Sequence, residues 1–154
     1  MEITVQQVAG VCFSIESHGR RILCDQPLNN GGTGLGLSPP ELVLASLGSC
    51  AAWCAHRVLT AKSLPATGLV VRVTEEMGTS PVRLDHFRIA ITLPPLTDER
   101  HASALRSSVE QCLIHYTLLH PPSIQVTASV GDTRGTTDAE PHSSEVVKSA
   151  PPPP

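Results

Sequence analysis

Apolar and polar residues alternate at the start of the chain, which is the pattern of β-strands with one buried face. Residues 3–8, 11–15 and 21–25 each alternate in part, with turn-forming residues between them. Gly19 precedes the third segment and tolerates the positive φ angle that a tight turn needs. The pattern predicts an antiparallel meander of three strands.

The spacing then becomes helical, after a glycine-rich loop at residues 27–36. Ser38 stands three residues before Glu41, which is the spacing of a capping box, and Pro39 suits the first helical position. The apolar pattern continues to about Lys62. We therefore predict one long helix that begins after Ser38.

The most apolar part of this helix is the run from residue 42 to residue 55. A helix that crosses a bilayer needs about 20 apolar residues, so this run is too short to do so. Its apolar surface continues almost all the way round. We expect a core helix wrapped by other elements, and no membrane partner.

The second half of the chain predicts two strands, a helix and a last strand. Residues 69–74 and 87–93 are strand-like, Thr97 begins a helix, and residues 124–130 alternate again. Apolar residues recur at helical spacing at Ala102, Leu105, Val109 and Cys112. This spacing predicts that Cys112 lies on the face of that helix that is turned to the core.

Composition separates one folded domain from a tail. The chain has 154 residues, enough for a single domain with its own core, and only 3% are aromatic. From residue 131 it consists mostly of polar residues, glycine and proline, and it ends in four prolines. We predict a domain over residues 1–130 and a disordered tail over residues 131–154.

Charge and cysteine usage exclude several classes of function. The net charge is −3 and no Lys/Arg cluster is present, so nucleic acid is not an expected partner. Five cysteines at irregular spacing argue against a secreted disulfide scaffold, and the first residues lack the pattern of a secretory signal. We expect a cytoplasmic protein with reduced thiols.

Two cysteines are the candidate chemistry, because Cys50 and Cys112 both stand on helices that face the core. Buried free thiols are often only packing, but two that meet could perform dithiol chemistry. Cys54 lies one helical turn after Cys50, where a disulfide is geometrically poor and zinc would lack two further ligands. The loop at residues 31–36 lacks the Gly-Lys-Ser/Thr ending of a phosphate loop. No metal or cofactor is expected.

Both cysteine motifs resemble those of the OsmC/Ohr superfamily of osmotically inducible and organic hydroperoxide resistance proteins. The stretch from Asp25 through the glycine-rich loop to Ser-Pro-Pro-Glu-Leu-Val-Leu-Ala-Ser-Leu-Gly-Ser-Cys50 is similar to the family's first motif. Cys112-Leu-Ile-His-Tyr-Thr-Leu-Leu-His-Pro-Pro is similar to its second motif. The order of the predicted elements also agrees, over roughly residues 1–130.

The resemblance implies an α+β fold in which antiparallel sheets wrap a long central helix and two protomers intertwine as a homodimer. It also implies a thiol-dependent peroxidase of the oxidative stress response. Cys50 would attack an organic hydroperoxide, Cys112 would resolve the sulfenic acid as a disulfide, and a dithiol or lipoyl-type reductant would reduce that disulfide.

The sequence departs from the family pattern at one position. Pro40 occupies the place of the Glu that, with an Arg, holds the thiolate and the peroxide in organic hydroperoxide resistance enzymes, while Glu41 falls one residue later. Arg20 or Arg21 could supply the arginine. The departure leaves open an alternative, a non-catalytic OsmC-like stress protein that responds to redox state or binds a small molecule.

Overall fold

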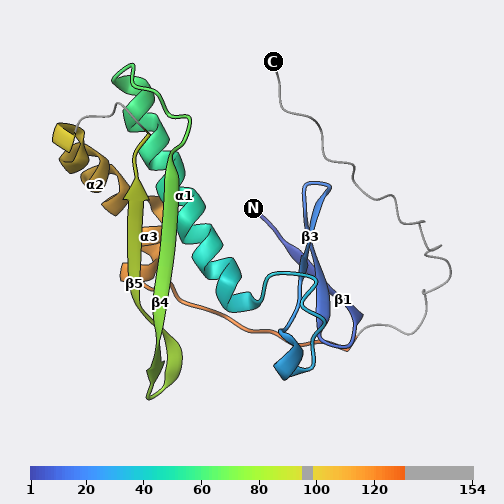
Figure 1. Cartoon of the computed structure of the whole chain (residues 1–154). Helices are drawn as coiled ribbons and strands as arrows, with labels where there is room; N and C mark the ends of the chain where they lie inside the picture. Colours follow the sequence, from blue (N-terminus) through green and yellow to red (C-terminus); the bar gives the residue numbers. More distant parts are fainter. Residues whose placement is uncertain (95–98, 131–154) are drawn as a thin grey trace. The chain divides into compact units, whose positions relative to one another are not determined.

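The computed structural model describes residues 1–94 and 99–130. The chain divides into two units, Met1–Pro122 and Ser123–Pro154, and the first contains every described helix and strand (Figure 1). The predicted tail, residues 131–154, lies outside the described residues.

The N-terminal sheet is the predicted meander. Strands β1 (Thr4–Ala9), β2 (Cys12–Ser17) and β3 (Arg20–Cys24) pair antiparallel in that order. The turn between β2 and β3 has positive φ angles at His18 (50°) and Gly19 (72°). Two consecutive positive φ angles suit the right-handed twist of a hairpin, and glycine adopts such an angle without strain.

Much of the apolar surface of this sheet is not covered by its own chain. The pairing sets Val5 opposite Ile15, and Ile15 opposite Ile22, so these three side chains share a face. Val5 is 57% exposed and Ile22 is 53% exposed. Adjacent apolar side chains that remain exposed mark a surface suited to association.

Asp25 fastens the glycine-rich loop that leads from β3 to the long helix. Its buried carboxylate accepts hydrogen bonds from the backbone N–H groups of Gln26 (2.8 Å), Thr33 (2.9 Å) and Leu35 (3.3 Å), and from the Thr33 hydroxyl (2.6 Å). The Thr33 hydroxyl, aided by these backbone groups, lowers the pKa of Asp25 to about 2. The loop therefore closes on a charged buried acceptor.

Helix α1 (Pro39–Ala61) begins as predicted. The Glu41 carboxylate accepts hydrogen bonds from the N–H (2.7 Å) and the hydroxyl (2.6 Å) of Ser38, which confirms the capping role of Glu41. One face of the helix is buried, and its residues recur about once per turn: Leu47, Ala51, Cys54, Ala55 and Leu59. Trp53, on another face, is 59% exposed, so one chain does not wrap the helix completely.

At 23 residues, α1 is long and apolar enough to meet the length and composition criteria of a membrane-spanning helix. Core helices of globular domains meet the same criteria. Here the buried face of α1 packs against β4 and β5, which form a hairpin, and against α2 and α3 (Figure 1).

The hairpin strands are β4 (Val70–Thr79) and β5 (Val82–Thr92), both longer than the sequence predicted. The turn was expected over residues 77–81, but Met77 pairs with Leu84 and continues the ladder. The connection is reduced to two residues, because cross-strand hydrogen bonds extend pairing into weakly strand-like sequence.

The prediction of one helix through Cys112 was wrong. A short 3-10 helix (Glu99–His101) leads into α2 (Ala102–Glu110), and a further helix, α3 (Leu113–Leu119), follows. Cys112 itself is extended (φ −70°, ψ 148°) and caps α3. The predicted helix start at Thr97 lies outside the described residues.

The predicted strand over residues 124–130 is also absent from the structure. Residues 123–130 carry no helix or strand, and Ile124 (83%) and Val126 (87%) are exposed. Alternation supplies a face to bury, but a strand also needs a neighbour to accept and donate its backbone hydrogen bonds.

Candidate active site

Cys50 lies in the middle of α1 and is only partly buried. It packs against the buried core cluster that α1 forms with α2 and Cys112. Gly48, one of the small residues of this stretch, allows α1 to approach β4 closely: a Cβ there would lie 3.1 Å from a methyl carbon of Val73. Gly48 therefore lets the part of α1 that carries Cys50 lie directly against β4.

Cys112 is 1% exposed, so the expectation that it faces the core is confirmed although it lies outside a helix. The backbone N–H of His115 donates a hydrogen bond to its sulfur (3.4 Å). Burial raises the pKa of the Cys112 thiol, the His115 N–H lowers it, and the nearby Cys50 raises it. Sequence reasoning missed this cap because cysteine is not a usual N-cap residue.

The structure brings Cys50 and Cys112 together. Cys50 lies close enough to raise the pKa of the Cys112 thiol, through side-chain hydrogen bonding and through its charge. Both are free thiols in this structure. Two adjacent thiols on different elements, one of them reachable from outside, are the arrangement that a reversible disulfide requires.

Cys54 extends this pair to three thiols, although its spacing from Cys50 in the sequence suggested only a poor disulfide or an incomplete zinc site. It is 7% exposed and lies one turn of α1 after Cys50. Burial and Cys50 raise the pKa of Cys54, while Arg57 and the Ser108 hydroxyl lower it. The position of Arg57, three residues after Cys54 on a helix, was readable from the sequence.

The candidate arginines lie on β3. Arg20 and Arg21 are both exposed, and Arg21 forms an ion pair with Glu16 on the neighbouring strand (3.3 Å). No described contact joins either arginine to Cys50. The carboxylate of Glu41 is also engaged, with Ser38.

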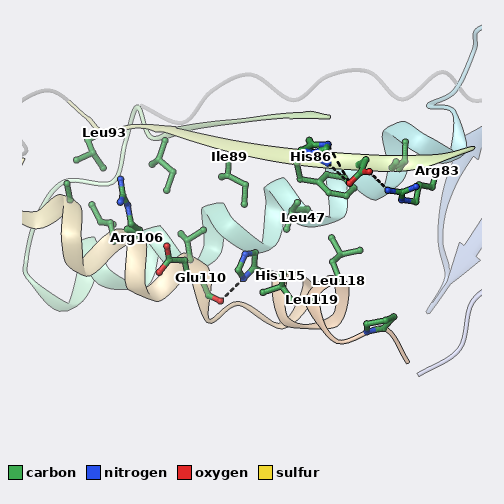
Figure 2. Close-up of a pocket in the computed structure, with 18 residues that line it drawn as sticks. Leu47, Arg83, His86, Ile89, Leu93, Arg106, Glu110, His115, Leu118 and Leu119 are labelled. Carbon is green, nitrogen blue, oxygen red and sulfur yellow. Dashed lines mark hydrogen bonds and ion pairs between the residues drawn. The ribbon is translucent and has the colours of Figure 1, made fainter. Parts of the chain in front are cut away.

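A cavity of about 1020 Å³ lies between β5 on one side and α2 and α3 on the other, with Leu47 of α1 contributing to its lining (Figure 2). Its walls are mostly apolar, and Arg83, His86, Arg106 and His115 add polar groups. Its lining includes none of the cysteines. The thiols therefore do not form the walls of this cavity.

Metal chemistry finds no support among the residues that the structure describes. They contain no group of three or more His, Cys, Asp or Glu side chains that could hold a metal ion. What the adjacent thiols of Cys50 and Cys112 can perform chemically is the formation of a reversible disulfide.

Comparison with known proteins adds a family and a fold. Residues 32–127 match the family described as OsmC-like protein. The structure is similar to that of a putative osmotic stress induced and detoxification response protein from Psychrobacter arcticus, with TM-score 0.69 and 23% identity, covering 75% of this chain and 85% of that one.

Two further solved structures show the same fold. An OsmC like protein from Mycoplasma pneumoniae gives TM-score 0.65 and 21% identity, covering 77% of this chain and 86% of that one. An organic hydroperoxide resistance protein OsmC from Legionella pneumophila gives TM-score 0.53 and 16% identity, covering 77% of this chain and 89% of that one. A search of curated proteins returns no match. The family match covers more than half of the chain and includes both Cys50 and Cys112, so the chain belongs to the OsmC-like family.

Proposed function

We propose that this protein is a thiol-dependent reductase of organic hydroperoxides, in which Cys50 is the peroxidatic thiol and Cys112 the resolving thiol. The observation that carries the proposal is the contact between these two thiols, one partly exposed and one buried. Membership of the OsmC-like family supports it, as do structural relatives named as hydroperoxide resistance proteins.

Each step has a group to perform it. The Cys50 thiolate attacks one oxygen of the O–O bond; that bond breaks, the sulfur is oxidised to sulfenic acid, and the other oxygen leaves as an alcohol after taking a proton. The Cys112 sulfur then attacks the Cys50 sulfur, water leaves, and a disulfide forms. A dithiol or lipoyl-type reductant reduces this disulfide to two thiols and becomes a cyclic disulfide itself. No cofactor takes part.

The surroundings of the thiols favour organic peroxides over hydrogen peroxide. Cys50 packs against an apolar cluster from α1 and α2, and β4 and β5 add further apolar side chains. An alkyl or aryl group gains free energy when it leaves water for such surroundings, whereas hydrogen peroxide does not. Five free cysteines also suit a reducing compartment such as the cytoplasm.

The test follows the loss of an organic hydroperoxide in the presence of dithiothreitol or dihydrolipoamide. We expect multiple turnovers for the wild type and none for Cys50→Ser. Cys12→Ser is the matched control, because Cys12 is a free thiol of the N-terminal sheet, and it should retain activity. A wild type without turnover, or a Cys50→Ser variant as active as the wild type, excludes the enzyme.

We also propose that the protein acts as a homodimer. One chain leaves Trp53 of α1 and the face of the sheet containing Val5 and Ile22 largely exposed. Burying such surfaces against a second copy removes apolar area from water at about 25 cal/mol per Å². Sedimentation equilibrium at micromolar concentration should give twice the mass of the chain, and a folded monomer contradicts this proposal.

One observation favours a second candidate, a redox-responsive protein without turnover. Pro40 replaces the family glutamate, and Glu41 is engaged with Ser38, so no carboxylate of the first helical turn is available to an active-site arginine. Intact mass after mild peroxide treatment separates the two candidates. Loss of two hydrogens without turnover in the presence of reductant favours this candidate, and loss with turnover favours the reductase.

A further inference from the structure

We propose that Cys54 is a positioning residue for Cys50, donating a hydrogen bond from its thiol to the Cys50 thiolate. The inference rests on the proposed function, because it assigns a role in activating the same nucleophile. It concerns a third cysteine that the two-thiol reaction does not use.

The geometry places the Cys54 thiol beside Cys50 and away from solvent. Cys54 follows Cys50 by one turn of α1, so both side chains project from nearly the same face. Cys54 is 7% exposed, whereas Cys50 is partly exposed. The hydroxyl of Ser108 on α2 donates to the Cys54 carbonyl (3.4 Å), which holds this turn of α1 against α2. A thiol that is buried and held in place, like that of Cys54, is suited to donate a hydrogen bond to Cys50 and not to react with a peroxide itself.

Protonation decides which thiol donates. Burial raises the pKa of both Cys54 and Cys112, and each is raised further by its contact with Cys50. Both neighbours therefore keep their protons and can donate S–H bonds to a negative sulfur at Cys50. Hydrogen bonds to a charged acceptor are stronger than those between neutral groups.

The other polar groups around Cys54 interact with Cys54 or Cys112, and no described contact joins them to the sulfur of Cys50. Arg57 on α1 and the Ser108 hydroxyl on α2 act on Cys54 itself and partly offset the effect of its burial. From α3, the His115 N–H binds the Cys112 sulfur. β4 and β5 present apolar side chains to this cluster: Val71, Val73, Phe87, Ile89 and Ile91. In a site where the family glutamate is replaced by Pro40, neighbouring thiols are the donors that the structure places at Cys50.

The experiment measures the rate at which iodoacetamide alkylates Cys50 as a function of pH, with mass mapping to identify the modified residue. The variants are Cys54→Ser, which keeps a donor, and Cys54→Ala and Cys54→Val, which lack one and bracket the size of cysteine. Cys12→Ala is the matched control. Since only the thiolate reacts, the midpoint of the profile reports the ionisation of Cys50.

Without the donor, we expect the midpoint to rise by about half to one pH unit in Cys54→Ala and Cys54→Val. In Cys54→Ser it should stay near the wild-type value, and in the control it should not move. Ala and Val profiles that match the wild type overturn the proposal, and so does a Ser profile that shifts as far as theirs, because the effect would then be structural. Either of the two donor-free variants suffices if the other does not fold.

Alkylation needs no peroxide, so the outcome is independent of turnover. A wild type that does not reduce hydroperoxides, yet shows the expected shifts, refutes the reductase and leaves the role of Cys54 in place.

Discussion

Leu47 and Leu59 allow a comparison of one substitution at two buried positions of α1. Leu47 is 1% exposed and Leu59 is 0% exposed, and both belong to the same core cluster. They differ in one respect: Leu47 lines the cavity between β5 and the C-terminal helices, and Leu59 does not. Replacing each with alanine removes the same atoms from the same helix.

The free energies of unfolding should differ because the spaces left behind differ. Both variants lose the transfer free energy of the deleted carbons, about 2 to 3 kcal/mol. Leu59→Ala also leaves a closed void whose lining loses its contacts, which brings its cost to about 4 kcal/mol. At Leu47 the new space joins a cavity of about 1020 Å³, so we expect little beyond the transfer cost.

Urea denaturation followed by circular dichroism, at one protein concentration, measures both costs. Leu28→Ala is the control: this leucine is 78% exposed, and its loss should change stability by no more than about 0.5 kcal/mol. Equal costs at positions 47 and 59 would refute the reasoning, since they would mean that the space beside Leu47 is filled in solution.

Further predictions concern the buried Asp25 carboxylate, two glycines, one before α1 and one within it, and the Cys112 thiol. The pKa of Asp25 is lowered from 3.8 to about 2, chiefly by the Thr33 hydroxyl. The stability that the Asp25 carboxylate confers is therefore complete above pH 3.8 and is lost as pH falls towards 2. In an acid titration followed by circular dichroism, Thr33→Val should unfold at higher pH than the wild type. Gly36→Ala should lower the melting temperature, because its Cβ would collide with the backbone oxygen of Leu23 in β3. Gly48→Ala should be the milder change, because its Cβ meets only a side chain, at 3.1 Å, and alanine has the higher helix propensity. Cys112→Ser should accumulate the sulfinic form of the peroxidatic thiol under excess peroxide, seen as a gain of about 32 Da by mass spectrometry, and a stable unmodified thiol would contradict its assignment as the resolving residue.

Local patterns predicted the elements whose stabilising contacts are short-range. The meander, the capping box at Ser38 and Glu41, and the long helix all appear as expected. In each, the residues that stabilise the element are neighbours in sequence: glycine at a turn, a carboxylate three residues from its partner, or apolar groups one turn apart.

Predictions failed where the spacing of apolar residues does not decide the conformation of the backbone. Helical spacing carried the second helix through Cys112, but that residue leaves the helix and caps the next one, held by the His115 N–H. The alternation at residues 124–130 predicted a strand, yet no described residue pairs with it. The periodicity of apolar residues predicts which side chains can be buried together. Whether a strand pairs, and where a helix ends, depends on the backbone groups available to form its hydrogen bonds.

By itself the sequence determined that this is a mixed helix-and-strand domain with thiols at positions 50 and 112 turned to its core. Only the tertiary structure decided that these two thiols meet and that Cys54 joins them. The physical reason is that burial follows from the pattern of apolar residues along one element, while the contact of two sulfurs 62 positions apart depends on how α1 packs against α2 and α3.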